Sequence, residues 1–203
     1  MNTEDARIAA LAAEQFHRHG ITATGVDALS RAAGISKRTL YERFGSKDGL
    51  IVAAYDALDL PVYEMFTADV EAKTDDPRAQ LDAFFAQLEP IFRMPEFRGC
   101  PFTNAASELS DPSHPAHDVV HRHKERIRRW LLARAKAAGA SNPEQLSRRL
   151  MLLFAGAQSQ ALLERSARPA REARELARSL VDAAIDSHQA RGIRRERHSV
   201  RHR

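Results

Sequence analysis

Basic and hydrogen-bonding side chains gather in residues 31–47, which read RAAGISKRTLYERFGSK. Against a single acid, Glu42, this segment carries five basic residues: Arg31, Lys37, Arg38, Arg43 and Lys47. Ammonium and guanidinium groups bind phosphates, and a guanidinium also donates in pairs to the edge of guanine. The segment therefore indicates a nucleic-acid interface, and an ordinary helix with solvated charges is the alternative interpretation.

Two short helices joined by a tight turn are expected to present these side chains, over about residues 26–33 and 37–44. Gly34 suits the turn, because glycine adopts backbone conformations that strain other residues. The arrangement is that of a helix-turn-helix, over about residues 25–44.

The second of these helices has a buried and an exposed side. At about 100° per residue, Leu40 and Phe44 share the buried side, while Arg38, Thr39 and Glu42 lie opposite. The exposed side thus offers hydrogen-bond donors to bases and phosphates.

The whole chain has a helical pattern, and no stretch alternates convincingly as a strand. We therefore expect an all-α fold of about nine helices. Asp76 and Pro77 should begin a helix whose apolar face extends to Phe92, and Pro61 should kink or break the fourth helix near Asp59.

The excess of basic residues lies mostly at the C-terminus. The chain has a formal net charge of +4, and residues 191–203 hold six arginines and one glutamate. Residues 1–190 hold 25 basic and 26 acidic residues. A solvated, disordered basic tail is expected at 191–203, with nonspecific nucleic-acid contact as the alternative.

Several classes of protein are excluded by composition and motifs. A single cysteine precludes an internal disulfide. The longest apolar run, Leu150 to Ala157, is too short for a membrane span, and early acids at Glu4 and Asp5 argue against a secretory signal, so a cytoplasmic protein is expected. No catalytic or nucleotide-binding motif is present, which argues against an enzyme. A helical small-molecule binder without DNA binding remains an alternative.

Residues 3–60, approximately, resemble the DNA-binding domain of the tetracycline-repressor (TetR) family of transcription regulators. The resemblance rests on an ordered set of positions: Phe16, Gly20, Thr24, Val26, Leu29, Ala32, Ala33, Gly34, Ile35, Ser36, Thr39, Leu40, Tyr41, Phe44, Ser46, Lys47 and Leu50. It implies a DNA-binding domain at 1–47, and a helical effector-binding and dimerisation domain at 48–190. The fourth helix, beginning at residue 47, links the two.

The resemblance also implies which residues contact DNA: Thr24, Ser36, Lys37, Arg38, Thr39, Tyr41 and Lys47. Arg38 is expected to read guanine, with Lys37 as a second candidate, and Lys47 to meet a phosphate. Glu42 either accepts a hydrogen bond from cytosine or remains solvated. Gly25 departs from the family pattern, because many members have a capping Thr or Ser there.

A homodimer is the partner that the resemblance implies, built from the last two helices, 143–165 and 169–190. Both helices carry apolar residues on more than one face, which an intrachain core would also explain. Two-fold symmetry would place two reading helices on a palindromic double-stranded operator.

A small, largely apolar effector of unknown identity is expected to release a repressor from its operator. The candidate effector contacts are mostly aromatic: Phe66, Phe85, Cys100, Asn104, Trp130 and Phe154. Plain hydrophobic core is the alternative for the aromatic residues.

Two further patterns have simple explanations. His114, His117 and His121 have spacing that aligns them on a helix, but the surrounding prolines favour a helix entrance with solvated histidines over a metal site. Cys100 is expected to be an inert buried thiol rather than a redox switch. We therefore expect neither a metal nor a cofactor.

Overall fold

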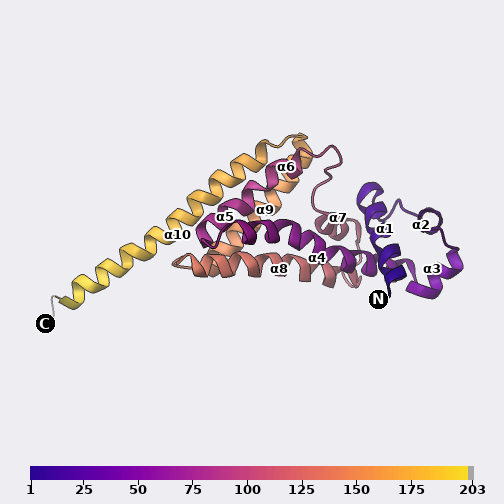
Figure 1. Ribbon diagram of the computed structural model, residues 1–203, viewed down its shortest axis with the longest axis horizontal. Helices are drawn as coiled ribbons and strands as arrows, with labels where there is room; N and C mark the ends of the chain where they lie inside the picture. Colours follow the sequence, from indigo (N-terminus) through magenta and orange to yellow (C-terminus); the bar gives the residue numbers. More distant parts are fainter. Residues whose placement is uncertain (201–203) are drawn as a thin grey trace. The chain divides into compact units, whose positions relative to one another are not determined.

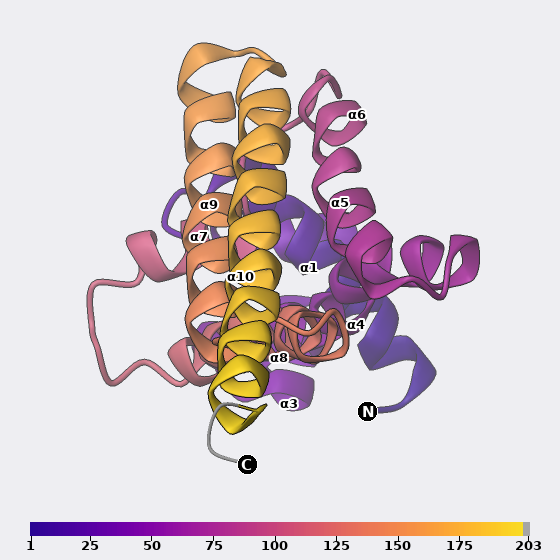
Figure 2. The same ribbon diagram turned by 90° about the vertical axis from the view of Figure 1, so that its left-hand side faces the viewer.

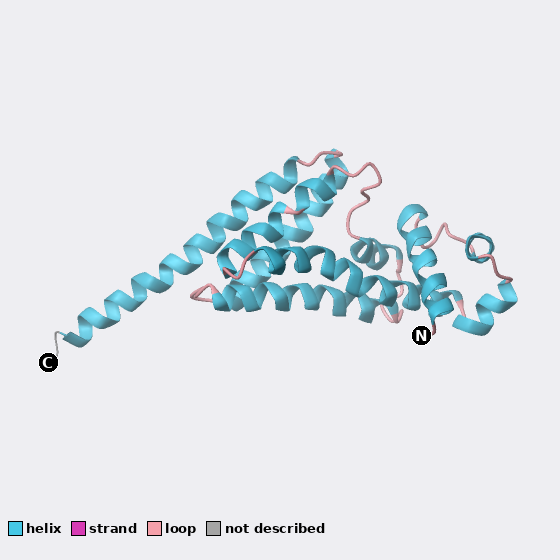
Figure 3. Ribbon diagram, viewed as in Figure 1, coloured by secondary structure: helices cyan, strands magenta, loops and turns pink. Residues whose placement is uncertain are grey.

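The computed structural model describes the backbone of residues 1–200 and the side chains of residues 1–185. Every regular element in this part is an α-helix, which confirms the all-α fold class (Figures 1 and 3). The helices are α1 (Thr3–His19), α2 (Val26–Ala33), α3 (Lys37–Phe44), α4 (Lys47–Lys73), α5 (Pro77–Ala86), α6 (Leu88–Phe92), α7 (Pro101–Glu108), α8 (Ala116–Ala137), α9 (Pro143–Glu164) and α10 (Arg168–Val200).

Two local expectations differ from this structure. The single helix expected up to Phe92 is divided at Gln87 into α5 and α6, which raises the number of assigned helices from nine to ten in the described chain. Pro61 does not break α4, which is assigned as one helix through it. An internal proline removes one backbone donor and crowds the preceding turn, so a helix continues through it only where packing holds it.

Polar caps and glycines explain most helix ends. Asn2 caps α1 by accepting from the Asp5 N–H at 2.8 Å. Asp76 accepts from the Arg78 and Ala79 N–H groups at the start of α5, as the sequence predicts. Asn142 caps α9 through the Gln145 N–H at 3.0 Å.

The chain forms two compact units. The first contains Met1–Met65 and Arg98–Glu125, and the second contains Phe66–Phe97 and residues from 126 on. The first unit therefore includes α7 and the start of α8, in addition to the expected DNA-binding residues. The functional boundary after residue 47 stays a prediction from the sequence.

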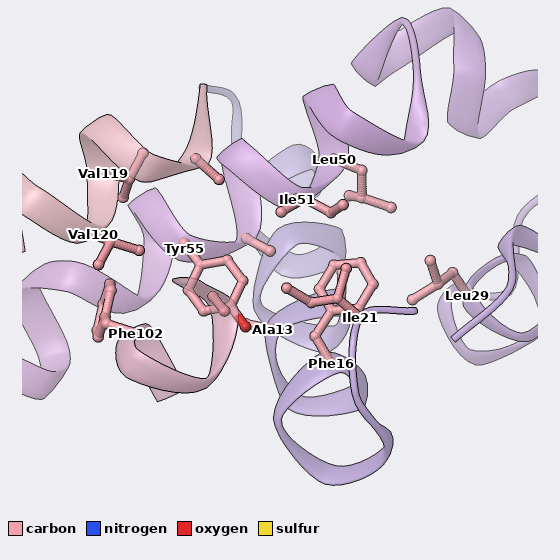
Figure 4. Close-up of a cluster of buried hydrophobic side chains, with 14 of the residues drawn as sticks. Ala13, Phe16, Ile21, Leu29, Leu50, Ile51, Tyr55, Phe102, Val119 and Val120 are labelled. Atoms are coloured by element: carbon pink, nitrogen blue, oxygen red, sulfur yellow. The ribbon is translucent and has the colours of Figure 1, made fainter. Parts of the chain in front are cut away.

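A continuous apolar cluster holds the first unit together (Figure 4). It joins α1 and the loop after it to α2, α4, α7 and α8, through side chains that are almost wholly buried: Phe16, Ile21, Leu29, Leu50, Ile51, Tyr55, Phe102, Val119 and Val120. Each such side chain contributes about 1.5–3 kcal/mol when fully buried. This core holds α2 and α3 in place within the first unit.

Aromatic side chains form much of the core of the second unit. The ring of Phe84 lies 5.1 Å from that of Phe154 and 5.4 Å from that of Trp130, and Phe66 contacts Phe154 edge-on at 5.1 Å. In the same unit α9 and α10 pack side by side as a helical hairpin (Figure 2).

The last helix, α10, continues past the predicted end at residue 190 to Val200. The side chains of the expected basic tail, and residues 201–203 altogether, lie outside the described residues. The disorder expected for residues 191–203 stays a prediction.

Candidate nucleic-acid interface

The turn between α2 and α3 is built by hydrogen bonds between near neighbours. Gly34 adopts a left-handed conformation, with φ 69° and ψ 28°. Its N–H donates to the Arg31 carbonyl at 3.2 Å, and the Ile35 N–H donates to the Ser30 carbonyl at 3.1 Å. These paired bonds form a Schellman motif, which ends α2 and redirects the chain into α3. The two helices have the bounds that the sequence predicts.

Ser36 caps the start of α3, the helix that carries most of the predicted DNA contacts. Its hydroxyl accepts from the Thr39 N–H at 3.0 Å and lies 2.8 Å from the Thr39 hydroxyl. Thr39 is partly buried. Both side chains therefore support the helix start in this structure.

The exposed side of α3 carries the remaining predicted contacts. The side chain of Arg38 is 88% exposed and that of Lys37 is 53% exposed. Tyr41 is 43% exposed. This side can therefore offer guanidinium, ammonium and phenol donors to a nucleic acid.

Carboxylates pair with these cations in the free protein. Lys37 contacts Asp27 of α2 at 2.5 Å, and the Arg38 Nε donates to Glu42 Oε1 at 2.8 Å. A third pair, between Arg43 and Asp5 at 2.5 Å, joins α3 to α1. Any DNA that binds here must displace these pairs or include them.

Two of the predicted DNA contacts bond to backbone carbonyls of the loop between α1 and α2. The Lys47 Nζ donates to the Ile21 carbonyl at 2.8 Å. Thr24 is only 3% exposed, and its hydroxyl donates to the Gly20 carbonyl at 2.6 Å. Both side chains therefore stabilise this loop, and their contacts with DNA stay predictions.

Glu108 of α7 supports the same loop. Its Oε2 accepts from the Thr22 N–H at 3.1 Å, and its carboxylate lies against Gly20, whose φ is +89°. A Cβ on Gly20 would lie 3.0 Å from that oxygen. No sequence signal could reveal this contact, because 86 residues separate Thr22 from Glu108.

The candidate effector contacts are divided between the two units. Phe66, Phe85, Trp130 and Phe154 are all buried in the second unit. Cys100 and Asn104 belong to the first unit. Cys100 accepts from Lys124 Nζ at 3.1 Å, and the Asn104 side chain donates to the Arg98 carbonyl at 2.8 Å. The structure therefore does not bring the whole predicted set together within one unit.

One cavity of about 310 Å³ lies between α5 and α10 in the second unit. Its lining combines the apolar side chains of Leu81 and Val181 with several charged side chains. Asp82 accepts from both Arg174 and Arg178 at 2.6–2.9 Å, and these two guanidiniums, Arg174 first, hold the pKa of Asp82 well below its usual range. None of the predicted effector contacts lines this cavity.

A buried polar pair in the first unit also escapes sequence reasoning. His123 Nδ1 lies 2.8 Å from Asp59 Oδ1, and both side chains are at most 5% exposed. The imidazole stacks on Phe102 with ring centroids 3.7 Å apart. The pair joins α4 to α8, and the two residues are 64 positions apart in the sequence.

The three predicted helix-entrance histidines have separate roles. His114 Nδ1 accepts from the Ala116 N–H at 3.1 Å, while its Nε2 lies 3.3 Å from Asp48. His117 Nε2 contacts the Leu109 and Asp111 carbonyls, and His121 is exposed. Among the described residues no group of three or more His, Cys, Asp or Glu side chains could hold a metal ion.

Another histidine, His17 of α1, has a perturbed pKa. Burial lowers the pKa of His17, and the positive charge of Arg98 lowers it further. Its Nδ1 is buried and has no hydrogen-bond partner in the described part of the chain.

Comparisons with known proteins cover both parts of this fold. Residues 8–54 match the family model described as bacterial regulatory proteins of the tetR family. Residues 77–177 match the model of a tetracyclin repressor-like C-terminal domain. None of the described helices combines the length and hydrophobicity that a membrane span needs.

Two solved structures are similar to this chain over most of its length. A TetR-type transcriptional regulator structure from Streptomyces avermitilis is 30% identical, with a TM-score of 0.76, and the match covers 90% of this chain and 98% of that one. A TetR-family regulator structure from Streptomyces coelicolor is 26% identical, with a TM-score of 0.75, over 91% and 96% of the two chains.

Among curated proteins, the HTH-type transcriptional regulatory protein RaaS of Mycobacterium tuberculosis is 38% identical over 87 residues, or 43% of this chain. That match spans only 39% of the length of RaaS. Two family models and a relative matched over nearly its whole length agree with the fold and with the helix-turn-helix. The chain therefore belongs to the TetR family of transcriptional regulators, which are not enzymes.

Proposed function

We propose that this protein is a homodimeric repressor that binds a palindromic operator through α3 and is released by a small, largely apolar effector. The observation that carries the DNA-binding part is the exposed side of α3, where Arg38, Lys37 and Tyr41 project from a helix fixed by a cap and a Schellman turn. Such a short helix on a rigid base suits the major groove.

Lys47 supports a phosphate contact of a different kind from the one at α3. Its ammonium is held by the Ile21 carbonyl at the start of α4. An ammonium has three donors, so it can keep this bond and still bind a phosphate oxygen. We therefore assign Lys47 to sequence-independent affinity and Arg38 to base reading.

Binding-site selection with the full-length protein, followed by salt titrations of variants, tests these roles. Lys47→Ala should weaken specific and nonspecific binding together and reduce the salt slope by about one. Arg38→Ala should instead relax preference at one base position. Arg93→Ala is the control, because Arg93 forms a similar exposed pair with Glu89 in the second unit. Unchanged binding in both α3 and α4 variants would contradict the assignment.

Exposed leucines support a dimer through α9 and α10. Leu152 and Leu163 of α9 are 75% and 74% exposed, and Leu176 of α10 is 56% exposed. The buried faces of both helices already pack within the second unit, so the exposed leucines remain for a partner. A second copy of the chain suits them, because two-fold symmetry pairs equivalent apolar faces.

The aromatic core of the second unit supports an apolar effector. The rings of Phe66, Phe84 and Phe154 contact one another, so an effector would have to enter between them and move them apart. A thermal-shift screen of small aromatic and aliphatic compounds tests this, because a ligand that binds the folded state raises the melting temperature. An effector must also release bound operator DNA, and a stabilising compound that leaves the DNA complex intact would be a ligand without the proposed role.

Repression is tested with a reporter gene under the selected operator. Expression should fall when the protein is present and recover when an effector is added. Increased expression in its presence would identify an activator instead.

A further inference from the structure

The pair formed by Arg38 and Glu42 lies where the proposed function places base recognition. The Arg38 Nε donates to Glu42 Oε1 at 2.8 Å, one helical turn apart on the exposed side of α3. We propose that Glu42 is a positioning residue, which orients the Arg38 guanidinium so that it reads guanine. This inference rests on the proposed DNA-binding function of α3.

The bond to Glu42 leaves the two terminal nitrogens of the Arg38 guanidinium able to bind a base. A guanidinium has five N–H donors in one plane, and Glu42 occupies only the Nε–H. The two terminal nitrogens of Arg38 make no hydrogen bond to any part of the chain that the structure describes. Two parallel donors at this end match the O6 and N7 acceptors of guanine.

Helix stability does not explain this pair. Positive charges are unfavourable at a helix N-terminus and negative charges are unfavourable near its C-terminus. α3 nevertheless has Lys37 and Arg38 in its first turn, with no acid there, and Glu42 near its end. Arginine before glutamate is also the weaker order for an i,i+4 pair. An exposed pair of this kind contributes little to folding, so a role at the DNA would not conflict with a structural one.

Binding of DNA would make the bond between Glu42 and Arg38 more important. Beside phosphates and away from water, an unpaired Glu42 carboxylate would be costly, and the Arg38 Nε–H is the donor already in contact with it. At guanine, Arg38 satisfies both the base and Glu42. At adenine, the N6 amino group faces the guanidinium with a donor instead of an acceptor, so Arg38 must turn away and leave Glu42 unpaired. Glu42 thus increases the penalty for the wrong base.

Asp27 provides a matched control. It is another exposed carboxylate, 62% exposed against 58% for Glu42, and it pairs with Lys37 at 2.5 Å. Its place in the first turn of α2 is explained by the helix dipole. Removing either charge should raise nonspecific DNA affinity, but only Glu42 touches Arg38.

The test uses the full-length protein and the operator found by selection. The base pair that loses its preference in Arg38→Ala is identified first, and dissociation constants are then measured with guanine or adenine at that position. The wild type should prefer guanine by about 5- to 150-fold. Glu42→Ala should lose most of this preference, and Glu42→Gln, which keeps an acceptor oxygen for Nε, should restore much of it. Asp27→Asn should keep the wild-type ratio while binding nonspecific DNA as tightly as the Glu42 variants.

Each contrary outcome has a separate meaning. A wild type without guanine preference would contradict both the proposed reading role of Arg38 and this inference. A normal preference in Glu42→Ala would overturn the inference alone. Loss of preference at a neighbouring cytosine, with the guanine preference intact, would show that Glu42 reads a base itself and does not position Arg38.

Discussion

The Glu108 carboxylate accepts a hydrogen bond from the Thr22 N–H at 3.1 Å, and so attaches α7 to the loop between α1 and α2. The same loop receives Lys47 from α4 through the Ile21 carbonyl. Two helices that are distant in sequence therefore hold the segment that leads into the helix-turn-helix.

Glu108→Ala should weaken this attachment. We expect the free energy of unfolding to fall by about 1 kcal/mol, the usual loss for a partly exposed hydrogen bond. The Thr22 amide should also exchange its hydrogen faster, which amide exchange followed by NMR would detect. Glu108→Gln keeps an acceptor oxygen and should preserve the protection. Equal protection in the alanine variant would show that the loop does not depend on α7.

Replacing Leu152 or Leu163 by glutamate should separate the proposed dimer. Each substitution places a charge on an exposed apolar face, and two-fold symmetry doubles it across the interface. We expect the dimer dissociation constant to rise at least about tenfold, the effect of 1.4 kcal/mol. Sedimentation velocity at micromolar concentrations measures this. Leu60→Glu is the control, because Leu60 is an exposed leucine of the first unit. A monomeric wild type would contradict the proposed interface.

Asp82→Asn should destabilise the protein most at neutral pH and progressively less in acid. Arg174 and Arg178 lower the pKa of Asp82 in the folded state, so its charge stabilises the fold above the unfolded-state pKa of about 3.9. That contribution is lost as the pH falls through the lowered pKa. We expect a loss of about 1–3 kcal/mol near pH 7, from hydrogen bonds to a charged group. Urea denaturation at pH 7 and pH 3 should show the difference between wild type and variant shrinking in acid.

His17 should make the protein less stable as the pH falls toward 5.5. Burial and the Arg98 charge lower the pKa of His17 in the folded state, so the folded chain binds this proton less readily than the unfolded chain, which takes it up near pH 6.5. Stability therefore falls with decreasing pH in this window, by at most about 1.4 kcal/mol per pH unit for one group. Arg98→Gln removes the nearby charge, and His17→Gln removes the titrating group. Melting temperatures from pH 7.5 to 5.5 should depend less on pH in both variants, and a wild-type slope in His17→Gln would contradict this origin.

The sequence determined the features that depend on neighbouring residues. The bounds of α2 and α3, the Gly34 turn and the caps at Ser36, Asp76 and Asn142 all follow from interactions spanning five residues or fewer. Helical periodicity placed Leu40 inside and Arg38 outside for the same reason. Such local patterns depend on backbone geometry that is constant along a helix.

The tertiary structure decided the features that require residues far apart in the chain. The sequence predicts Lys47 as a phosphate contact, and its bond to the Ile21 carbonyl forms only because α4 packs against the loop before α2. The Glu108 contact, the buried His123 and Asp59 pair and the division of the predicted effector contacts between two units are further examples. No local pattern encodes them, because each depends on how separate helices pack, and packing satisfies polar groups with whichever distant side chain it brings within hydrogen-bond distance.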